Sequence, residues 1–194
     1  MGESNSFKGF HKEGTQFLMD LAFNNRKDWF NDHKDVFEEH LLAPSREFVI
    51  SMGERLKGLA PEIHADPRVD KSIFRIYRDT RFSKDKSLYK THIGVLLWEG
   101  LGPKLENSGF YFHLEPPKLM IGVGLLCFTK PVLEEYRKSV IHPKHGKELA
   151  QTIQKFNERK DYQMGKKHYK KIPRGFDPNH ENASYFLYNG LTVG

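Results

Sequence analysis

Apolar side chains in the first third of the chain recur every three or four residues, which is the spacing of one face of an α-helix. This spacing predicts amphipathic helices over about residues 11–60, with Asn24-Asn25 as a cap and Pro44 in the first turn of the last helix. We expect the buried side of these helices to consist of Phe17, Leu18, Leu21, Trp29, Phe30, His33, Phe37, Leu41, Phe48, Met52, Leu56 and Leu59.

The period changes to two after Ser72, which is the alternation of a β-strand. In the first of these stretches the alternation places Arg75 and Arg78 on opposite faces. Pro116-Pro117 separates the last two strands and favours an antiparallel hairpin, because proline suits a turn but cannot donate in a ladder. The predicted central sheet, over about 72–128, has four or more mostly antiparallel strands, at 73–79, 91–99, 109–115 and 118–128.

Helical periodicity returns after the sheet. Thr129 with Pro131 predicts one helix start, and a further helix is expected over about 144–157. The chain is therefore predicted to be α+β, with helices packed on the sheet. Because 194 residues can bury one sizeable core but are few for two, we expect a single domain over 1–194, with C-terminal helices and a basic segment over about 130–194.

Composition narrows the functional classes. A formal charge of +6 and a pI near 9.2 favour anionic partners without choosing among nucleic acid, phosphorylated metabolites and a membrane surface. Cys127 is the single cysteine and lies in an apolar run, so a disulfide framework is excluded and the exposed setting of a reactive thiol is not expected. No segment is typical of a signal peptide or a membrane span, so we expect a cytoplasmic protein with no membrane partner. Nucleotide and nucleophile motifs are absent, and we predict no cofactor.

Cations and aromatic residues interleave between Phe74 and Lys86, across the first strand and the loop after it. Guanidinium groups match the oxygens of phosphate and carboxylate, and lysines add point charge, so several converging cations would bind a doubly charged anion. The alternative is that Asp79 and Asp85 pair with these cations as structural salt bridges. The predicted ligands are Arg78, Arg81, Lys84 and Lys86, with Arg75 and Lys90 as alternates.

Tyr111, His113 and Glu115 are expected to share one sheet face beside these cations, so that Tyr111 and His113 line the ligand site. An imidazole beside a phenol is a candidate general acid or base, and His113 or Asp79 would be the base if the protein is an enzyme. A half-buried, hydrogen-bonded histidine is the alternative. Arg137 and Arg174 are expected to reach the same site from later segments.

His142 and His145, together with His168 or His180, have the composition of a metal site. Pro143 stands between the first two and disturbs the helix that would aim both rings at one ion. We therefore predict no metal.

The motif that runs from Phe74 to Lys86 continues as Tyr89-Lys90-Thr91-His92-Ile93-Gly94. Further characteristic stretches are Phe7-Lys8-Gly9-Phe10, Asn24-Asn25-Arg26, Trp29-Phe30, Ala65-Asp66-Pro67-Arg68, Phe110-Tyr111-Phe112-His113-Leu114 and Pro173-Arg174-Gly175-Phe176. Over nearly its whole length the chain thus closely resembles the family catalogued as domain of unknown function 2461. Ser87-Leu88 stands where the resemblance implies Thr-Pro, which is expected to loosen that turn, and Gly194 comes earlier than the usual end of the family. The resemblance supports one domain and carries over no catalytic residue, because no activity is established for the family.

The segment 155–174 carries a net charge of +6, equal to that of the whole chain, and interleaves Tyr162, His168 and Tyr169 with its cations. Such a composition suits a surface that follows a nucleic-acid backbone and stacks on bases, although solvated lysine runs are common. Our preferred hypothesis is the binding, with turnover as an option, of a small phosphorylated or polycarboxylate anion in a cation-lined pocket on the sheet. The alternatives are a nucleic-acid-associated protein that uses 155–174, and a non-catalytic structural or partner-binding domain.

Overall fold

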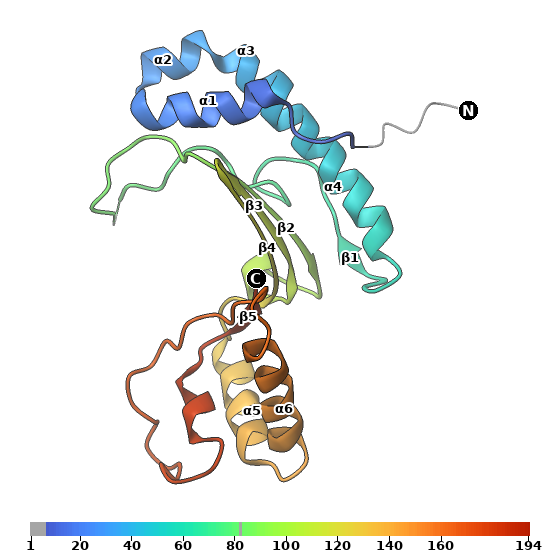
Figure 1. The fold of residues 1–194 in the computed structure, drawn as a ribbon, viewed down its shortest axis with the longest axis vertical. Helices are drawn as coiled ribbons and strands as arrows, with labels where there is room; N and C mark the ends of the chain where they lie inside the picture. Colours follow the sequence, from blue (N-terminus) through green and yellow to red (C-terminus); the bar gives the residue numbers. More distant parts are fainter. Residues whose placement is uncertain (1–6, 82) are drawn as a thin grey trace. The chain divides into compact units, whose positions relative to one another are not determined.

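The computed structural model describes residues 7–81 and 83–194, so Phe82 of the central motif lies outside the described residues. Helices accompany a five-stranded antiparallel sheet of order β1-β2-β3-β4-β5 (Figure 1), which confirms the predicted α+β class. The chain separates into two compact units, one made of residues 1–100 and 110–121 and the other of residues 101–109 and 122–194. The single domain expected over 1–194 stays a prediction.

The N-terminal helices of the first unit follow the predicted stripe but are divided differently. His33 leaves the helical conformation, and a π-helical turn containing His40 then runs without a break into the last helix. Pro44 lies in the first turn of that helix, as predicted. Leu59 follows its end and is 78% exposed, so the prediction that Leu59 faces the core is wrong. The elements are α1 (Lys12–Phe23), α2 (Lys27–Asp32), α3 (Lys34–Phe37), the π-helical turn η1 (Glu38–Leu42) and α4 (Ala43–Leu56).

The sheet of the first unit places its apolar residues against these helices. The rings of Phe48 in α4 and Phe112 in β3 lie 4.6 Å apart between centroids. A stacked pair of Phe30 and Tyr89, with centroids 4.2 Å apart, joins α2 to the segment that precedes β2. The strands are β1 (Ile63–His64), β2 (Ile93–Glu99), β3 (Gly109–Glu115) and β4 (Lys118–Leu125), of which Gly109 and residues 122–125 belong to the second unit.

The hairpin of β3 and β4 turns at Pro116-Pro117, as the sequence predicts. β4 ends at Leu125, three residues before the predicted end. Gly124 has φ +132°, a conformation that L side chains rarely adopt, and the backbone N–H of Phe128 donates to Asn189 outside the sheet. β4 therefore ends early because the next backbone hydrogen bond, from Phe128, goes to Asn189 and not to a neighbouring strand.

The predicted strand over 73–79 is an extended segment interrupted by a bulge in its partner. Isolated bridges join Ile73 to Val95 and Tyr77 to Tyr89. Between the two bridges the first segment advances four residues, from 73 to 77, whereas its partner advances six, from 89 to 95. The two additional residues on the β2 side break the ladder between the bridges. The predicted alternation of burial nevertheless holds, with Ile76 buried and both Arg75 and Tyr77 exposed.

The second unit has a core of its own. Phe186 is fully buried and packs with Tyr136, Val140 and Tyr188. The two helices expected after the sheet are present and lie side by side (Figure 1). A three-residue strand near the C-terminus, too short to show a period, was not predicted and pairs with β4. The elements are the short 3-10 helices η2 (Lys104–Glu106) and η3 (Ala183–Leu187), α5 (Lys130–Ile141), α6 (His145–Asn157) and β5 (Leu191–Val193).

Among the described residues, no helix combines the length and the apolar character needed to cross a membrane.

Candidate anion-binding site

The bulge before β2 presents Lys90, Thr91 and His92 beside the segment over 73–79. Backbone bonds from Lys90 to Ile76 and from Phe74 to Gly94 hold the two ends of this bulge. Bulges commonly occur next to functional sites because they aim side chains out of the regular alternation. The site therefore begins at an irregularity that period-two patterning cannot predict.

Asn25 fixes the start of this segment from the helical region. Its side-chain amide donates to the backbone carbonyl of Tyr89, and its side-chain oxygen accepts from the backbone N–H of Tyr89, both at 2.9 Å. Asn24-Asn25 was predicted to be a cap. Asn24 does end α1 as its C-cap, but Asn25 caps no helix, because Arg26 precedes α2 and α2 has no side-chain cap. Asn25 instead positions the residue immediately before Lys90.

Lys90 is a partly buried cation that feels the charges of two arginines. Its ammonium donates to the backbone carbonyl of Arg75 at 2.7 Å and lies 5.7 Å from the centroid of the Phe74 ring. Burial lowers the pKa of Lys90, and the charges of Arg75 and, less strongly, Arg78 lower it further, whereas Asp70 acts in the opposite direction. Like charges held together in a partly buried place are unfavourable, and an anion would relieve their repulsion.

Arg78 has one part of its guanidinium paired and another part without a partner. Its Nη1 lies 3.0 Å from Oδ2 of Asp85, and the side chain is 30% exposed. Its Nε is buried and has no hydrogen-bond partner among the described residues. A buried donor without a partner costs about 1–3 kcal/mol, so an arginine in this state is well suited to bind an anion or a water molecule.

Tyr111, His113 and Glu115 form a connected row on one face of β3, as the alternation predicts. The distances are 2.9 Å from the Tyr111 hydroxyl to Nδ1 of His113 and 3.4 Å from Nε2 of His113 to Glu115. A Cβ on Gly94 would lie 2.9 Å from the Tyr111 hydroxyl, so a larger residue there would displace this phenol from its present position. Burial raises the pKa of Tyr111, which keeps the phenol protonated at neutral pH.

Thr91 and His92 join this row from the bulge. The Thr91 hydroxyl donates to Glu115 at 3.2 Å, and the ring of His92 lies against that of His113 with centroids 4.2 Å apart. Burial opposes ionisation of Glu115, but the hydrogen bonds from His113 and Thr91 together with the charges of His113 and His92 outweigh it and lower the pKa of Glu115. Neither bulge residue was predicted to belong to the site, although both stand within the motif that carries the family resemblance.

His92 is held neutral. Burial, followed by the charge of His113 and those of Lys90 and Arg78, lowers its pKa from 6.5 to about 4, although Glu115 acts in the opposite direction. The unfolded chain therefore takes up a proton near pH 6.5, whereas the folded chain takes it up only near pH 4. The free energy of unfolding should accordingly decrease as the pH falls through this range.

We expect this loss to be on the order of 2 kcal/mol, because water around a half-buried ring screens part of the effect. Urea unfolding of the wild type and of His92→Gln at both ends of the range measures it, and the variant should lose less stability on acidification. Equal losses in the two proteins would show that His92 does not contribute.

Arg81 and Lys86, two of the cations predicted to bind the anion from the loop, form hydrogen bonds with other residues of that loop. Arg81 forms a two-point pair with Asp79, at 3.0 and 2.7 Å, and the Lys86 ammonium donates to the Thr80 carbonyl at 2.8 Å. Lys84 is exposed. Hydrogen bonds from Arg81 hold the pKa of Asp79 well below its usual range, which makes Asp79 a poor proton acceptor and favours His113 as the candidate base.

Ser87 closes the loop at its other end. Its backbone N–H and its hydroxyl both donate to Oδ1 of Asp85, at 2.9 and 2.7 Å, in the turn where the family resemblance implies Thr-Pro. These hydrogen bonds come first among the causes that lower the pKa of Asp85, before the charge of Arg78. The carboxylate that pairs with Arg78 is thus fixed by the loop itself.

The remaining predicted residues belong to the second unit. The guanidinium of Arg137 lies over the Tyr169 ring, 5.5 Å from its centroid, and Arg174 is exposed. That both reach the anion site stays a prediction. Cys127 is exposed and its sulfur lies 3.1 Å from the side-chain amide of Asn189, so the expectation of an unexposed thiol is wrong.

Two groups of three metal-ligand residues lie within the described chain, and neither contains His142 or His145. One of them is His92, His113 and Glu115, with ligand atoms within 4.8 Å of one another. The positive charges of Lys90 and Arg78 that lower the pKa of His92 also oppose a divalent cation at this place. The arrangement therefore suits an anion better than a metal.

A family model described as conserved hypothetical protein (DUF2461) matches residues 13–194, nearly the whole chain. The chain belongs to this family. The match includes the bulge, the row on β3 and Asn25. Neither a curated protein nor a solved structure matches the chain.

Proposed function

We propose that this member of the DUF2461 family binds a small anion bearing phosphate or several carboxylate groups at Lys90 and Arg78. The observation that carries the proposal is the buried Nε of Arg78, which has no partner among the described residues and lies in the same charged group as Lys90. The guanidinium of Arg78 can donate directed hydrogen bonds to an anionic group, and the ammonium of Lys90 adds a compact positive charge. Arg75 adds positive charge nearby.

The row on β3 gives this binding site a group able to move a proton. His113 has Nδ1 within hydrogen-bond distance of Tyr111 and Nε2 facing Glu115, so its tautomer and ring orientation are constrained by both neighbours. A transfer or hydrolysis reaction at the bound anion would use His113 as acid or base. This reaction is proposed only for an anion that binds at Lys90 and Arg78. The proposal includes a cytoplasmic location, which the single cysteine supports.

The test is thermal unfolding of the full chain with inorganic phosphate, a nucleoside monophosphate and citrate, each compared with sodium chloride at equal ionic strength. A bound ligand at about 100 times its dissociation constant stabilises the folded state by roughly 2.7 kcal/mol, so an effective anion should raise the melting temperature by several degrees. If none of the three anions acts beyond the salt control, the proposal is wrong.

Nucleic acid is the second candidate ligand. The observation that favours it is the exposure of Lys166, Lys167, Lys170 and Lys171 in the second unit. Two aromatic rings of the segment carry cations of the protein itself, because Arg137 lies over Tyr169 and Arg159 lies over Tyr162, and this makes them less suited to stacking on bases. A single-stranded oligonucleotide in the same panel separates the candidates, since its binding would weaken steeply with salt.

A further inference from the structure

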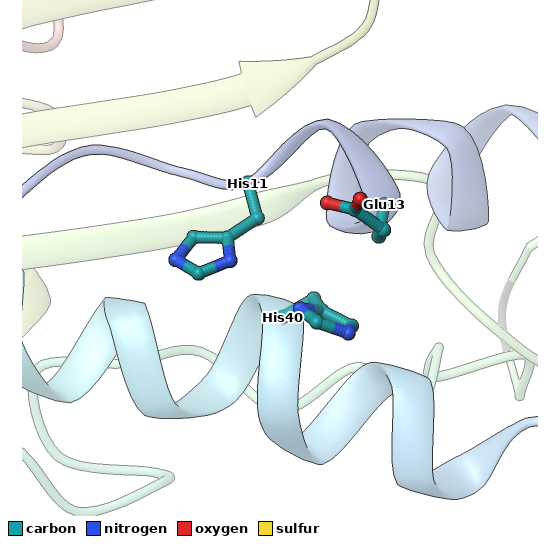
Figure 2. Close-up of side chains that lie close together, drawn as sticks. All are labelled: His11, Glu13 and His40. Atoms are coloured by element: carbon teal, nitrogen blue, oxygen red, sulfur yellow. The ribbon is translucent and has the colours of Figure 1, made fainter.

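The start of α1 lies directly against the π-helical turn η1. The backbone carbonyl of His40 lies 2.3 Å from the place where a Cβ on Gly14 would stand, so only glycine permits this approach. The close contact brings His11, immediately before α1, and Glu13, in its first turn, next to His40. Figure 2 shows the three side chains gathered between the start of α1 and the helix that carries His40.

We propose that His11, Glu13 and His40 bind one divalent transition-metal ion of the zinc class. Each offers a ligand atom, and these atoms lie within 4.8 Å of one another. Two imidazoles and one carboxylate are a donor set that zinc commonly takes, with water at the fourth position. This site is separate from the anion site and goes beyond the proposed function.

The state of His40 is an independent reason for the proposal. Its Nδ1 is buried and has no hydrogen-bond partner among residues 7–81 and 83–194. Such an atom is costly unless something binds it. π-helical turns in otherwise α-helical segments are rare and often occur at functional sites, and His40 lies in one.

The geometry requires only a small adjustment. Tetrahedral zinc, with bonds of about 2.0–2.2 Å, places neighbouring ligand atoms roughly 3.4 Å apart. His11 and Glu13 are exposed and can rotate toward the half-buried His40, whose ring lies 5.4 Å from that of His11 between centroids. His40 thus acts as the fixed ligand and the other two close on the ion. The metal would join the start of α1 to η1.

Calorimetric titration of the chelator-treated full chain with zinc chloride tests the site. We expect one zinc ion per chain, with affinity at least about tenfold lower in His11→Ala and in Glu13→Gln. Both residues are exposed, so these variants leave the core intact, and circular dichroism verifies their folding. Cobalt substituted for zinc should give the visible absorption of a tetrahedral site, and His11→Ala should lose it.

Two control variants separate this site from other histidines. The double variant His142→Ala/His145→Ala removes a stacked pair whose rings lie 4.2 Å apart but which has no third ligand among the described residues. His113→Gln removes the other group of three. Both controls should bind zinc as the wild type does. Absence of zinc binding, unchanged affinity in His11→Ala and Glu13→Gln, or loss of binding in His113→Gln would each overturn the proposal.

Discussion

Replacing Lys90 with methionine is expected to weaken anion binding about 10–100-fold. Lys90→Met keeps an apolar stem over Phe74 but removes the ammonium, and a hydrogen bond to a charged group contributes about 1.5–3 kcal/mol, with each 1.4 kcal/mol equal to a factor of ten. Titration calorimetry with the anion that gives the largest thermal shift in the wild type measures the effect.

Lys84→Met is the matched control, because it removes the same charge from an exposed position of the loop that the sequence favoured. We expect it to change the affinity less than about threefold, as a solvated charge contributes little. If Lys84→Met loses as much anion affinity as Lys90→Met, or more, the anion binds at the loop and the assignment to Lys90 is refuted.

Replacing Tyr89 with alanine is expected to lower the free energy of unfolding by about 3–5 kcal/mol. Tyr89 is 2% exposed, and its ring stacks on Phe30 with centroids 4.2 Å apart, so truncation leaves a cavity between α2 and the segment before β2. Urea unfolding measures the loss. The variant should also bind the anion more weakly at temperatures where it is folded, because Tyr89 precedes Lys90.

Tyr77→Ala serves as the control for Tyr89→Ala. Tyr77 lies on the neighbouring segment, with its ring 5.1 Å from that of Tyr89, but it is 54% exposed. Its truncation removes the same number of atoms mostly from water and should cost about 1 kcal/mol. Similar losses for the two variants would mean that the stacked pair is not a specific part of the core.

The proposed anion site illustrates how much of a binding surface can be predicted from the sequence. The composition around Arg78 predicts an anionic ligand, which stays a prediction, and it gives Lys90 only as an alternate. The alternative that Asp79 and Asp85 pair with the loop cations was predicted, and both pairs are present, Arg81 with Asp79 and Arg78 with Asp85. The unpartnered Nε of Arg78 does not follow from composition, because it depends on the path of the loop. Asn25 contacts Tyr89 across 64 residues of sequence, a distance over which no local pattern carries information.

The family resemblance and the strand patterns predicted more of the fold than of the site. The strand over 109–115 was predicted with its observed bounds, whereas the one over 73–79 is interrupted. Both stretches alternate in sequence, so the difference comes from the partner strand. A bulge of two residues before β2 breaks the ladder that the stretch 73–79 would otherwise form. The group of His11, Glu13 and His40 was not predicted, because His40 stands 27 positions after Glu13 and lies near it through the packing of Gly14.

The amino-acid sequence by itself determined the helical N-terminal region, the antiparallel hairpin and the excess of cations, since burial periodicity and charge are properties of neighbouring residues. Only the tertiary structure decided that the charge of Arg78 acts on Lys90, that Asn25 bonds to Tyr89 before the bulge, and that His11 and Glu13 lie near His40. Those contacts join segments far apart in the chain, and their free energy arises from packing that no single segment encodes.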